Sequence, residues 1–182
     1  MYPIIRVIKE LIAHRNAAPI SVTGTHTSTH RCWPQDIDYY FEMNNGRILT
    51  LLDLNRTVLA KRTGLLKVLR ANNWGLTMAG VSVRYRRRIR PFEKFETKGR
   101  ALCWDERFIY LEQVMIKANG ETANQALYRS AVTGPDGIVP PALVLQQLGQ
   151  DITTSPTPPE WVQNWIDADA TRPWPPKILS EP

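Results

Sequence analysis

The sequence predicts a single α+β domain in which an antiparallel sheet surrounds one long helix. Residues 44–62 carry apolar side chains over more than half of a helix circumference, which indicates a helix covered by other structure on most sides. Four later segments alternate apolar and polar residues, as half-buried strands do. Two of these segments flank Asn119-Gly120, a pair typical of a tight hairpin turn. In chain order this predicts a strand, a long helix and a four-stranded antiparallel meander.

Residues 1–20 are predicted to form a helical extension that precedes the domain. Its apolar residues recur at helical spacing, at Ile4, Ile5, Ile8, Leu11 and Ile12. We expect a short helix packed on the domain, with a basic membrane-surface helix as the alternative. Residues 21–33 then show an alternating pattern and are rich in β-branched side chains, which predicts the first strand. Pro34 ends this strand.

The later elements follow from changes in the apolar period. A short helix is expected at 65–71, after Gly64 ends the long helix. The four strands are expected at 76–89, 95–105, 107–118 and 122–133, and a short helix with proline in its first turn at 140–148. The domain is thus predicted to span 21–149. A proline-rich tail follows at 150–182, with one short helix at 159–169 that places Trp161 and Trp165 on one face.

Composition limits the class of protein. The chain has 182 residues, of which 43% are hydrophobic and 22% charged, which is ordinary for one globular domain. No apolar run reaches the length of a membrane span, so none is expected. Two cysteines, Cys32 and Cys103, make neither a disulfide framework nor a zinc site, and they favour a reducing, cytoplasmic compartment. The formal net charge is +6, and residues 84–100 account for all of it. This basic segment fits a phosphate-bearing small ligand or a short nucleic-acid contact.

Several chemically capable residues have ordinary structural interpretations. His26 and His30 share one face of a predicted strand, about 13 Å apart at the usual rise per residue, so they cannot bind one metal ion together. We expect polar strand histidines and no metal site. Cys103 is expected to be a small core residue. Asn55, within the apolar arc of the long helix, is expected to be a buried amide with satisfied hydrogen bonds.

The most informative segment is 36–47, whose sequence is Asp-Ile-Asp-Tyr-Tyr-Phe-Glu-Met-Asn-Asn-Gly-Arg. Two carboxylates stand just before the N-terminus of the predicted buried helix. A turn followed by a helix cap, with Asn44 or Asn45 as the capping residue, explains this composition. A catalytic interpretation needs a carboxylate in a partly dry cleft beside helix N–H groups that hold a developing oxyanion.

This segment resembles the signature Asp-x-Asp-x-x-Gly-His-Val-Asn-Asn-x-x-Tyr of hotdog-fold acyl-CoA thioesterases, in the 4-hydroxybenzoyl-CoA thioesterase-like branch. The resemblance continues at 51–56, 83–87, 104–112 and 140–145, and covers about 21–148. It implies a hotdog fold, with an antiparallel sheet wrapped around a central helix, and hydrolysis of an acyl-CoA thioester to a free acid and CoA. It also implies a homo-oligomer, dimer or tetramer, with its site between subunits, and it implies no metal or prosthetic group as cofactor.

In that family the second aspartate acts as nucleophile or as general base for water, and here it is Asp38. The resemblance gives this residue five active-site neighbours: Asp36, Phe41, Glu42, Asn44 and Asn45. Two of them depart from the family pattern, Phe41 in place of Gly and Glu42 in place of His. Phe41 is expected to reshape or partly fill the acyl pocket. Glu42 is expected to raise the pKa of one carboxyl group in the pair with Asp38, or else to face solvent.

Strand alternation predicts that Arg84, Arg86 and Arg88 share one face, where their guanidinium groups suit the phosphates of CoA. An edge strand protected by charge against aggregation is an equally weighted interpretation. Two other functions remain open. A non-hydrolytic acyl-thioester binding protein is favoured if Phe41 and Glu42 have disabled the site. A nucleic-acid binder using the arginines and Tyr85 is disfavoured, because aromatic residues do not recur along the segment, so no nucleic-acid partner is expected.

Overall fold

The computed structural model describes residues 2–150 and 154–176. Its elements in chain order are α1 (Ile4–Ala13), β1 (His26–Arg31), η1 (Pro34–Asp36), α2 (Asn45–Arg62), α3 (Leu65–Ala71), β2 (Gly75–Tyr85), β3 (Lys94–Trp104), β4 (Ile109–Lys117), β5 (Thr122–Gly134), β6 (Gly137–Val139), α4 (Pro141–Gln147) and α5 (Glu160–Ala170). Every predicted helix and strand is present. Strands β1 and β2 are shorter than predicted, and η1 and β6 were not predicted. None of the helices in the described part of the chain is long and apolar enough to cross a membrane.

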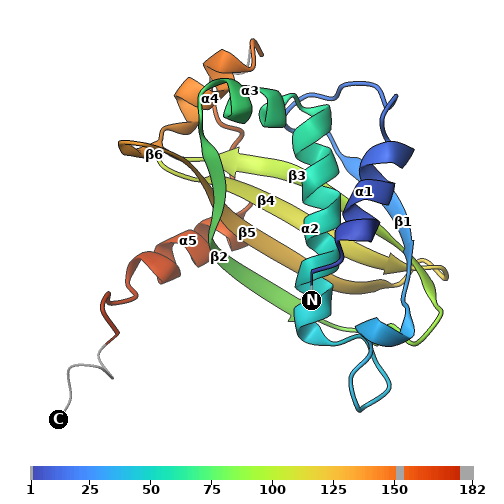
Figure 1. Cartoon of the computed structure of the whole chain (residues 1–182). Helices are drawn as coiled ribbons and strands as arrows, with labels where there is room; N and C mark the ends of the chain where they lie inside the picture. The colour runs from blue at the N-terminus through green and yellow to red at the C-terminus, as the bar shows by residue number, and fades with distance from the viewer. Residues whose placement is uncertain (1, 151–153, 177–182) are drawn as a thin grey trace.

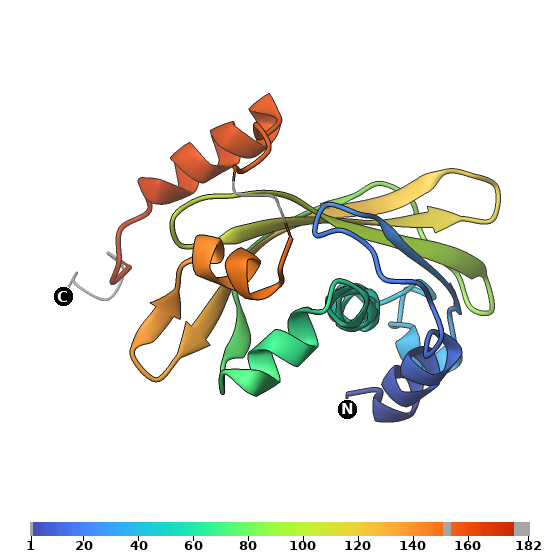
Figure 2. The same cartoon turned by 90° about the horizontal axis from the view of Figure 1, so that it is seen from above.

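The strands form one antiparallel sheet in the order β1-β3-β4-β5-β2, with β6 paired to the end of β5. The sheet curls around α2, which lies on its concave side (Figures 1 and 2). The predicted α+β hotdog architecture is therefore confirmed. The predicted four-stranded meander is wrong in one respect, because only β3, β4 and β5 follow one another in space. Strand β2 pairs with β5, and residues 86–93 cross the end of the sheet before β3 begins (Figure 1).

Helix α2 is buried on most sides, as its apolar arc predicts. Leu51 and Leu52 are fully buried, and Asn55 is buried with them. The Asn55 amide nitrogen donates to the carbonyl oxygens of His26 and Thr97, both at 3.3 Å, and its oxygen accepts from Gln113 at 3.0 Å. The expectation of a satisfied buried amide is confirmed. A Cβ atom at Gly99 would lie 2.3 Å from the Asn55 oxygen, so this close contact requires glycine.

Helix α1 packs beside α2 and β1 through a mixed side that includes Arg6, Val7 and Glu10. Glu10 is buried, and Arg6 forms an ion pair with Asp36. Four isoleucines face away from the domain instead, at Ile4, Ile5, Ile8 and Ile12. The sequence prediction of a helix packed on the domain is correct, although the packed face is the opposite of the one that apolar periodicity suggests.

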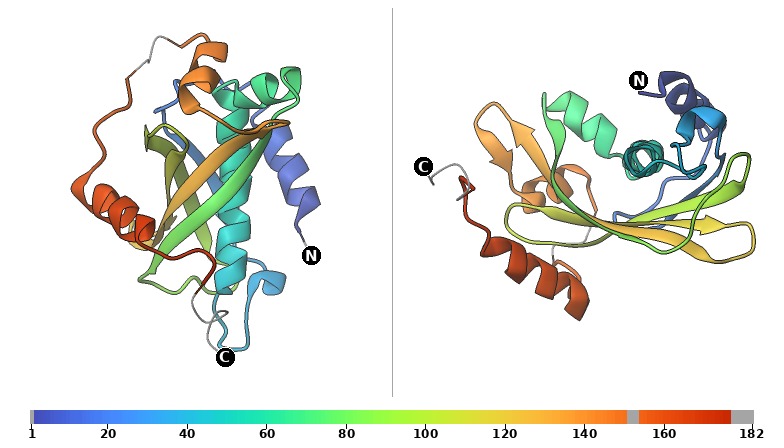
Figure 3. Two further views of the ribbon diagram at one scale, coloured as in Figure 1. Left: turned by 90° about the vertical axis from the view of Figure 1, so that its left-hand side faces the viewer. Right: turned by 90° about the horizontal axis from the view of Figure 1, so that it is seen from below.

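Helix α5 lies on the convex side of the sheet, across from α2 (Figures 2 and 3). Val162 is fully buried there in a cluster with Cys103, Tyr110 and Leu127, and Trp165 packs against the same cluster. Cys103 is therefore a small core residue, as predicted. Trp161 lies on the same helix but is 45% exposed. The division of the chain at 20 and 149 is a proposal, and the docking of α5 shows that part of the tail packs on the sheet.

Candidate functional site

Asp38 lies in a tight loop between the 3-10 helix η1 and helix α2. Ile37 and Met43 face each other in an isolated antiparallel bridge that closes the loop. The Asp38 N–H donates to the Glu42 carbonyl oxygen at 2.9 Å, and the Asp38 carboxylate accepts the Tyr40 N–H at 2.9 Å. Asp38 is half-buried. The loop therefore holds this carboxylate in one orientation with part of it open to solvent.

Phe41 occupies the tip of this loop with a backbone φ of +59°, in the left-handed region. Glycine adopts that conformation without strain, whereas a side chain with a Cβ atom does so at a cost. The glycine of the family signature thus corresponds to a real backbone requirement, which this chain meets with phenylalanine. The ring is 77% exposed. Phe41 therefore fills no pocket formed by the part of the chain that the structure describes.

Glu42 is tied to the basic segment. Its carboxylate forms an ion pair with the Arg88 Nε at 2.6 Å. Neither alternative that the sequence left for Glu42 included this contact with Arg88, and the alternative that couples Glu42 to Asp38 stays a prediction. The pair joins the Asp38 loop to the chain segment that follows β2, two parts of the sequence more than forty residues apart.

Asp36, two residues before Asp38, is fully buried. Its two carboxylate oxygens accept hydrogen bonds from Arg6 at 2.7 Å and from Arg47 at 2.8 and 3.1 Å, and from the Trp33 N–H at 3.0 Å. Burial by itself would raise the pKa of Asp36, but these donors outweigh it and hold the pKa below its ordinary value. Asp36 is thus an ionised residue that fastens α1 and α2 to the segment that leads into the Asp38 loop.

Sequence reasoning missed both arginine partners of Asp36. Arg47 stands within the quoted motif, where its distance of 11 residues from Asp36 gives no local pattern. Arg6 is 30 residues away on a different helix. Only the three-dimensional arrangement brings these three side chains together.

Asn44 is the residue that caps α2. Its side-chain oxygen accepts from the N–H groups of Gly46 at 2.9 Å and Arg47 at 3.3 Å, and its carbonyl oxygen accepts from Ile48. The predicted cap is confirmed, with Asn44 rather than Asn45 in that role. Asn45 is the first residue of α2 and is exposed.

The arginines do not share one strand face, and that prediction is wrong. Strand β2 ends at Tyr85, because the N–H groups of both Arg86 and Arg87 donate to the single carbonyl oxygen of Ala123 and interrupt the ladder. Arg84 is still in the strand and points to the convex side, where it lines a cavity of about 350 Å³ with Trp161.

Arg86 and Arg88 lie on the other side of this break. They line a cavity of about 160 Å³ together with Glu42, Met43, Asn45, Ile48, Tyr85, Arg87 and Ile89. This cavity brings together the end of the Asp38 loop, the first turn of α2 and residues 85–89, which we call the arginine segment. Fixed positive charge and a helix N-terminus both favour an anionic group.

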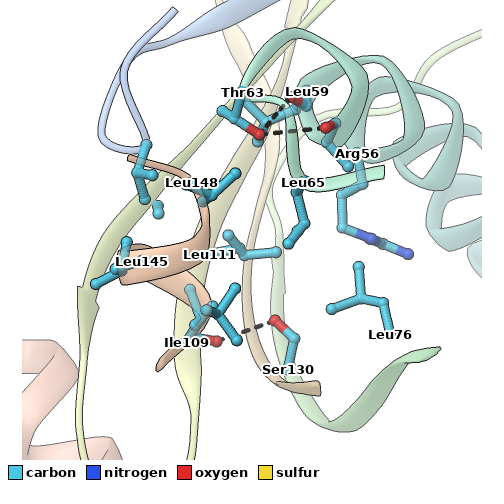
Figure 4. Close-up of a pocket in the computed structure, with 14 residues that line it drawn as sticks. Arg56, Leu59, Thr63, Leu65, Leu76, Ile109, Leu111, Ser130, Leu145 and Leu148 are labelled. Atoms are coloured by element: carbon cyan, nitrogen blue, oxygen red, sulfur yellow. Dashed lines mark hydrogen bonds between the residues drawn. The ribbon is translucent and has the colours of Figure 1, made fainter. Parts of the chain in front are cut away.

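A third cavity, which is apolar, lies between the C-terminal half of α2, the sheet and helices α3 and α4 (Figure 4). Its polar side chains already have partners, since Ser130 donates to the Ile109 carbonyl oxygen at 3.0 Å and Thr63 to that of Leu59 at 3.1 Å. The volume is about 50 Å³, comparable with one or two water molecules at about 30 Å³ each. At this size it does not accommodate CoA or a long acyl chain.

The three histidines gather around Glu10 at the contact between α1 and β1. The Nδ1 atoms of His14 and His30 each lie 3.6 Å from the Glu10 carboxylate, and the rings of His14 and His26 meet edge to face at 4.8 Å. His30 and His26 are buried, and the His30 Nε2 atom lies 2.9 Å from the Ser28 hydroxyl. Among the described residues, no group of three His, Cys, Asp or Glu side chains is arranged to hold a metal ion.

This cluster predicts that the protein loses stability in mild acid. Burial and neighbouring cationic groups lower the pKa of His26 and of His30 to about 4, against 6.5 in the unfolded chain. The unfolded state then binds more protons, so stability falls as the pH drops from about 6.5 towards 4, by at most about 1.4 kcal/mol per pH unit for each histidine. Burial raises the pKa of Glu10, which opposes part of this loss.

Thermal unfolding measured at pH 7 and pH 5 checks this expectation. The midpoint should be lower at pH 5, and a His30→Gln variant should show a smaller difference between the two pH values. Equal midpoints for the unaltered protein would contradict it.

Residues 32–166 match the model of the thioesterase-like superfamily. Among curated proteins, the protein THEM6 of Xenopus laevis is 35% identical over 134 residues, a match that covers 73% of this chain and 63% of that protein. The match thus spans less than two thirds of the length of that relative.

Two solved structures show how widely the fold is shared. The probable thioesterase YbaW of Escherichia coli matches with a TM-score of 0.63 at 16% identity, over 67% of this chain and 95% of that chain. The protein SAV2348 of Staphylococcus aureus, solved in complex with CoA, matches with a TM-score of 0.61 at 14% identity, over 80% of this chain and 96% of that chain. At such identities the likeness concerns the fold alone.

Proposed function

The chain belongs to the thioesterase-like superfamily, and from this premise we propose that it hydrolyses an acyl-CoA thioester to a free acid and CoA. The observation that carries the proposal is the cavity of about 160 Å³ shared by the Asp38 loop, the first turn of α2 and the arginine segment. It offers a place for an anionic group of CoA beside the loop that carries Asp38, with Glu42 and Met43 of that loop in its lining and Asp38 outside it. The CoA found in the Staphylococcus aureus protein of the same fold adds support.

In the proposed reaction Asp38 acts in one of two ways. As a general base, its carboxylate takes a proton from water while the water oxygen attacks the thioester carbon. As a nucleophile, it attacks that carbon itself to give a mixed anhydride, which water then hydrolyses. In both routes the carbon–sulfur bond breaks and the CoA thiolate leaves and takes up a proton. Neither route needs a metal ion or prosthetic group. That the protein uses no cofactor stays a prediction.

The first turn of α2 supports one candidate for the oxyanion donor. Asn44 occupies the N–H groups of Gly46 and Arg47 through its side chain and that of Ile48 through its carbonyl oxygen. The Asn45 N–H has no such partner among the described residues, and Asn45 lines the cavity. We therefore assign the oxyanion contact to this N–H, where the helix dipole also favours negative charge.

The edge of the sheet supports a homo-oligomer. One side of β2 pairs with β5, while its other side has no strand partner within the described residues. Val81 and Tyr85 on this strand are 41% and 44% exposed. A long open edge of this kind invites pairing with another chain, which would place the cavity beside the neighbouring subunit. Dimer and tetramer are both consistent with it, and sedimentation at micromolar protein concentration distinguishes them from a monomer.

A non-hydrolytic acyl-thioester binding protein is the second candidate function. The observation that favours it is the pair of departures at Phe41 and Glu42, the second of which is engaged by Arg88. Thiol release from a panel of aryl, short-chain and long-chain acyl-CoA esters decides between the two. Turnover of any ester supports hydrolysis, whereas saturable binding of CoA esters without thiol release supports the binding protein. We expect the reaction in the cytoplasm, with no nucleic-acid partner.

The position of the arginines gives a prediction for CoA binding. Replacing Arg86 and Arg88 together with alanine should raise KM for a CoA ester about 10- to 100-fold, because each lost charged hydrogen bond costs about 1.5–3 kcal/mol before solvent screening reduces it. The value of kcat should change little, since both side chains bind the substrate without touching the reacting carbon. Steady-state kinetics of thiol release measures both constants.

Arg84→Ala is the control, since it removes one arginine of the same basic segment that lies on the convex side of the sheet, outside this cavity. KM should stay near the unaltered value for this variant. An equal rise in KM for Arg84→Ala would restore the three-arginine CoA site that the sequence suggests. An unchanged KM in the double variant would instead support the alternative role of the arginines, which is to protect an edge strand against aggregation.

A further inference from the structure

Helix α1 presents an isoleucine face to solvent, made of Ile4, Ile5, Ile8 and Ile12. These side chains are 62%, 84%, 51% and 56% exposed. Surface helices ordinarily turn such a face towards the core, and leaving it in water forfeits the free energy of burial. A contiguous exposed apolar surface of this kind marks an interaction site.

The orientation of α1 is fixed by polar contacts and is not a loose arrangement. Arg6 donates to Asp36 at 2.7 Å and to the Arg31 carbonyl oxygen at 3.0 Å. Lys61 Nζ, from α2, donates to the carbonyl oxygens of Leu11 at 3.1 Å and His14 at 3.4 Å, near the C-terminal end of α1. These bonds, the buried Glu10 and the packing of Val7 hold that side of α1 against the domain, so the isoleucine face points outwards. Helix α1 itself lies on the outside of the domain beside α2 (Figures 1 and 3).

The exposed charges on α1 itself and on the turn after it have one sign, and the nearest acidic side chain on α2, Asp53, is paired with Arg56. Lys9 and Arg15 are exposed on α1 and the turn after it, while Glu10, the one acidic residue between positions 2 and 20, is buried. Tyr2, half exposed, lies at the N-terminal end of the face. An apolar stripe bordered by cationic side chains is the profile of a helix that lies in the interface of an anionic lipid bilayer.

We propose that α1 docks this protein on the surface of an anionic membrane. The isoleucine face enters the boundary between headgroups and acyl chains, and Lys9 and Arg15 meet the lipid phosphates. The docking lies in the plane of the membrane and requires no spanning helix. It is independent of the proposed hydrolysis, because neither the isoleucines nor the two cations contribute to the Asp38 loop or the arginine cavity.

A second copy of the chain suits this face less well. A helix of ten residues is about 15 Å long, and one face of it offers less than the roughly 800 Å² per partner that a stable interface buries. A two-fold contact through the face would also bring Lys9 close to its own copy, and like charges oppose such a contact. A lipid surface presents the opposite charge and has no lower limit on contact area.

Vesicle flotation with the full chain tests the proposal. The probes are vesicles of phosphatidylcholine alone and vesicles of equal parts phosphatidylcholine and phosphatidylglycerol. The unaltered protein should float with the phosphatidylglycerol vesicles and much less with phosphatidylcholine, and added salt should weaken the binding. An Ile5→Glu/Ile8→Glu variant should lose at least about 10-fold in apparent affinity, because two charges then replace two of the four isoleucines, including Ile5, the most exposed of them.

The matched control is Thr27→Glu/Thr29→Glu, which adds the same two charges at exposed positions of the neighbouring edge strand β1. It should bind clearly more tightly than the isoleucine variant. Three results would overturn the proposal. They are the absence of flotation for the unaltered protein, equal binding of the isoleucine variant and its control, and a drop in oligomer size specific to the isoleucine variant. The last result would identify the face as a contact between copies. Circular dichroism confirms that each variant is folded.

Discussion

Asp38→Asn is expected to lower kcat for thioester hydrolysis by about 10²- to 10⁴-fold, the usual contribution of a positioned acid–base group, with a larger loss if Asp38 is the nucleophile. Asparagine has nearly the same shape and still accepts the Tyr40 N–H, so the loop and the substrate contacts should survive. It carries no charge and neither attacks an acyl carbon nor takes a proton from water efficiently. Thiol release from the best CoA ester found measures kcat, and equilibrium binding of CoA shows whether the affinity of the variant for CoA is retained.

Glu42→Gln provides the comparison for this variant. It removes a carboxylate from the same loop and breaks the pair with Arg88, yet leaves Asp38 in place. A moderate effect in Glu42→Gln beside a large one in Asp38→Asn supports the assignment. A folded Asp38→Asn protein that keeps full turnover would show that another group does the chemistry.

Asp36→Asn is expected to destabilise the protein by about 3–5 kcal/mol, the cost of breaking a buried ion pair by removing one partner. The substitution leaves the largely buried guanidinium groups of Arg6 and Arg47 beside a neutral side chain that is itself fully buried. A mild effect would suit a residue that only shapes a turn, and the two arginines argue against that role. Urea unfolding followed by circular dichroism measures the difference in the free energy of unfolding.

Glu121→Gln is the control for this second prediction. It also removes one carboxylate from an arginine pair, but Glu121 and Arg87 are both exposed, so the change in stability should be small. If Asp36→Asn fails to fold, Arg6→Gln removes one of the two cations and leaves Asp36 paired with Arg47, and should cost less. Asp36→Asn with the stability of the unaltered protein would contradict the ionic role of Asp36.

Local patterns predicted the elements of this fold well. The apolar arc of α2 and the alternation in β3, β4 and β5 each depend on residues close together in the chain. The place of β2 in the sheet depends on pairing with β5 instead of β3, and no local pattern encodes that choice. The early end of β2 has the same origin, since it follows from how Arg86 and Arg87 share the Ala123 carbonyl oxygen on another strand.

The parts of the candidate site formed by residues close together in the sequence could be predicted, whereas contacts between distant parts of the chain could not. The motif gave Asp38 as the catalytic candidate, a prediction that stays open, and the cap at Asn44. It did not show that Glu42 reaches Arg88 or that Arg84 lies on the other side of the sheet. The orientation of α1 escaped prediction because apolar periodicity finds a face without showing what that face meets. Here the polar side has the stronger partners, in Asp36 and Lys61.

The arginine on α1 also bears on how the protein can be shortened. A boundary at residue 20 suggests that an N-terminal extension could be removed from an intact hotdog domain. Cutting there would remove Arg6 and leave Asp36, fully buried, with half of its positive partners. It would also remove the carbonyl oxygens that hold Lys61. Helix α1 therefore supports the segment that leads into the Asp38 loop, and we expect that a shortened protein has to include this helix to keep the loop in place.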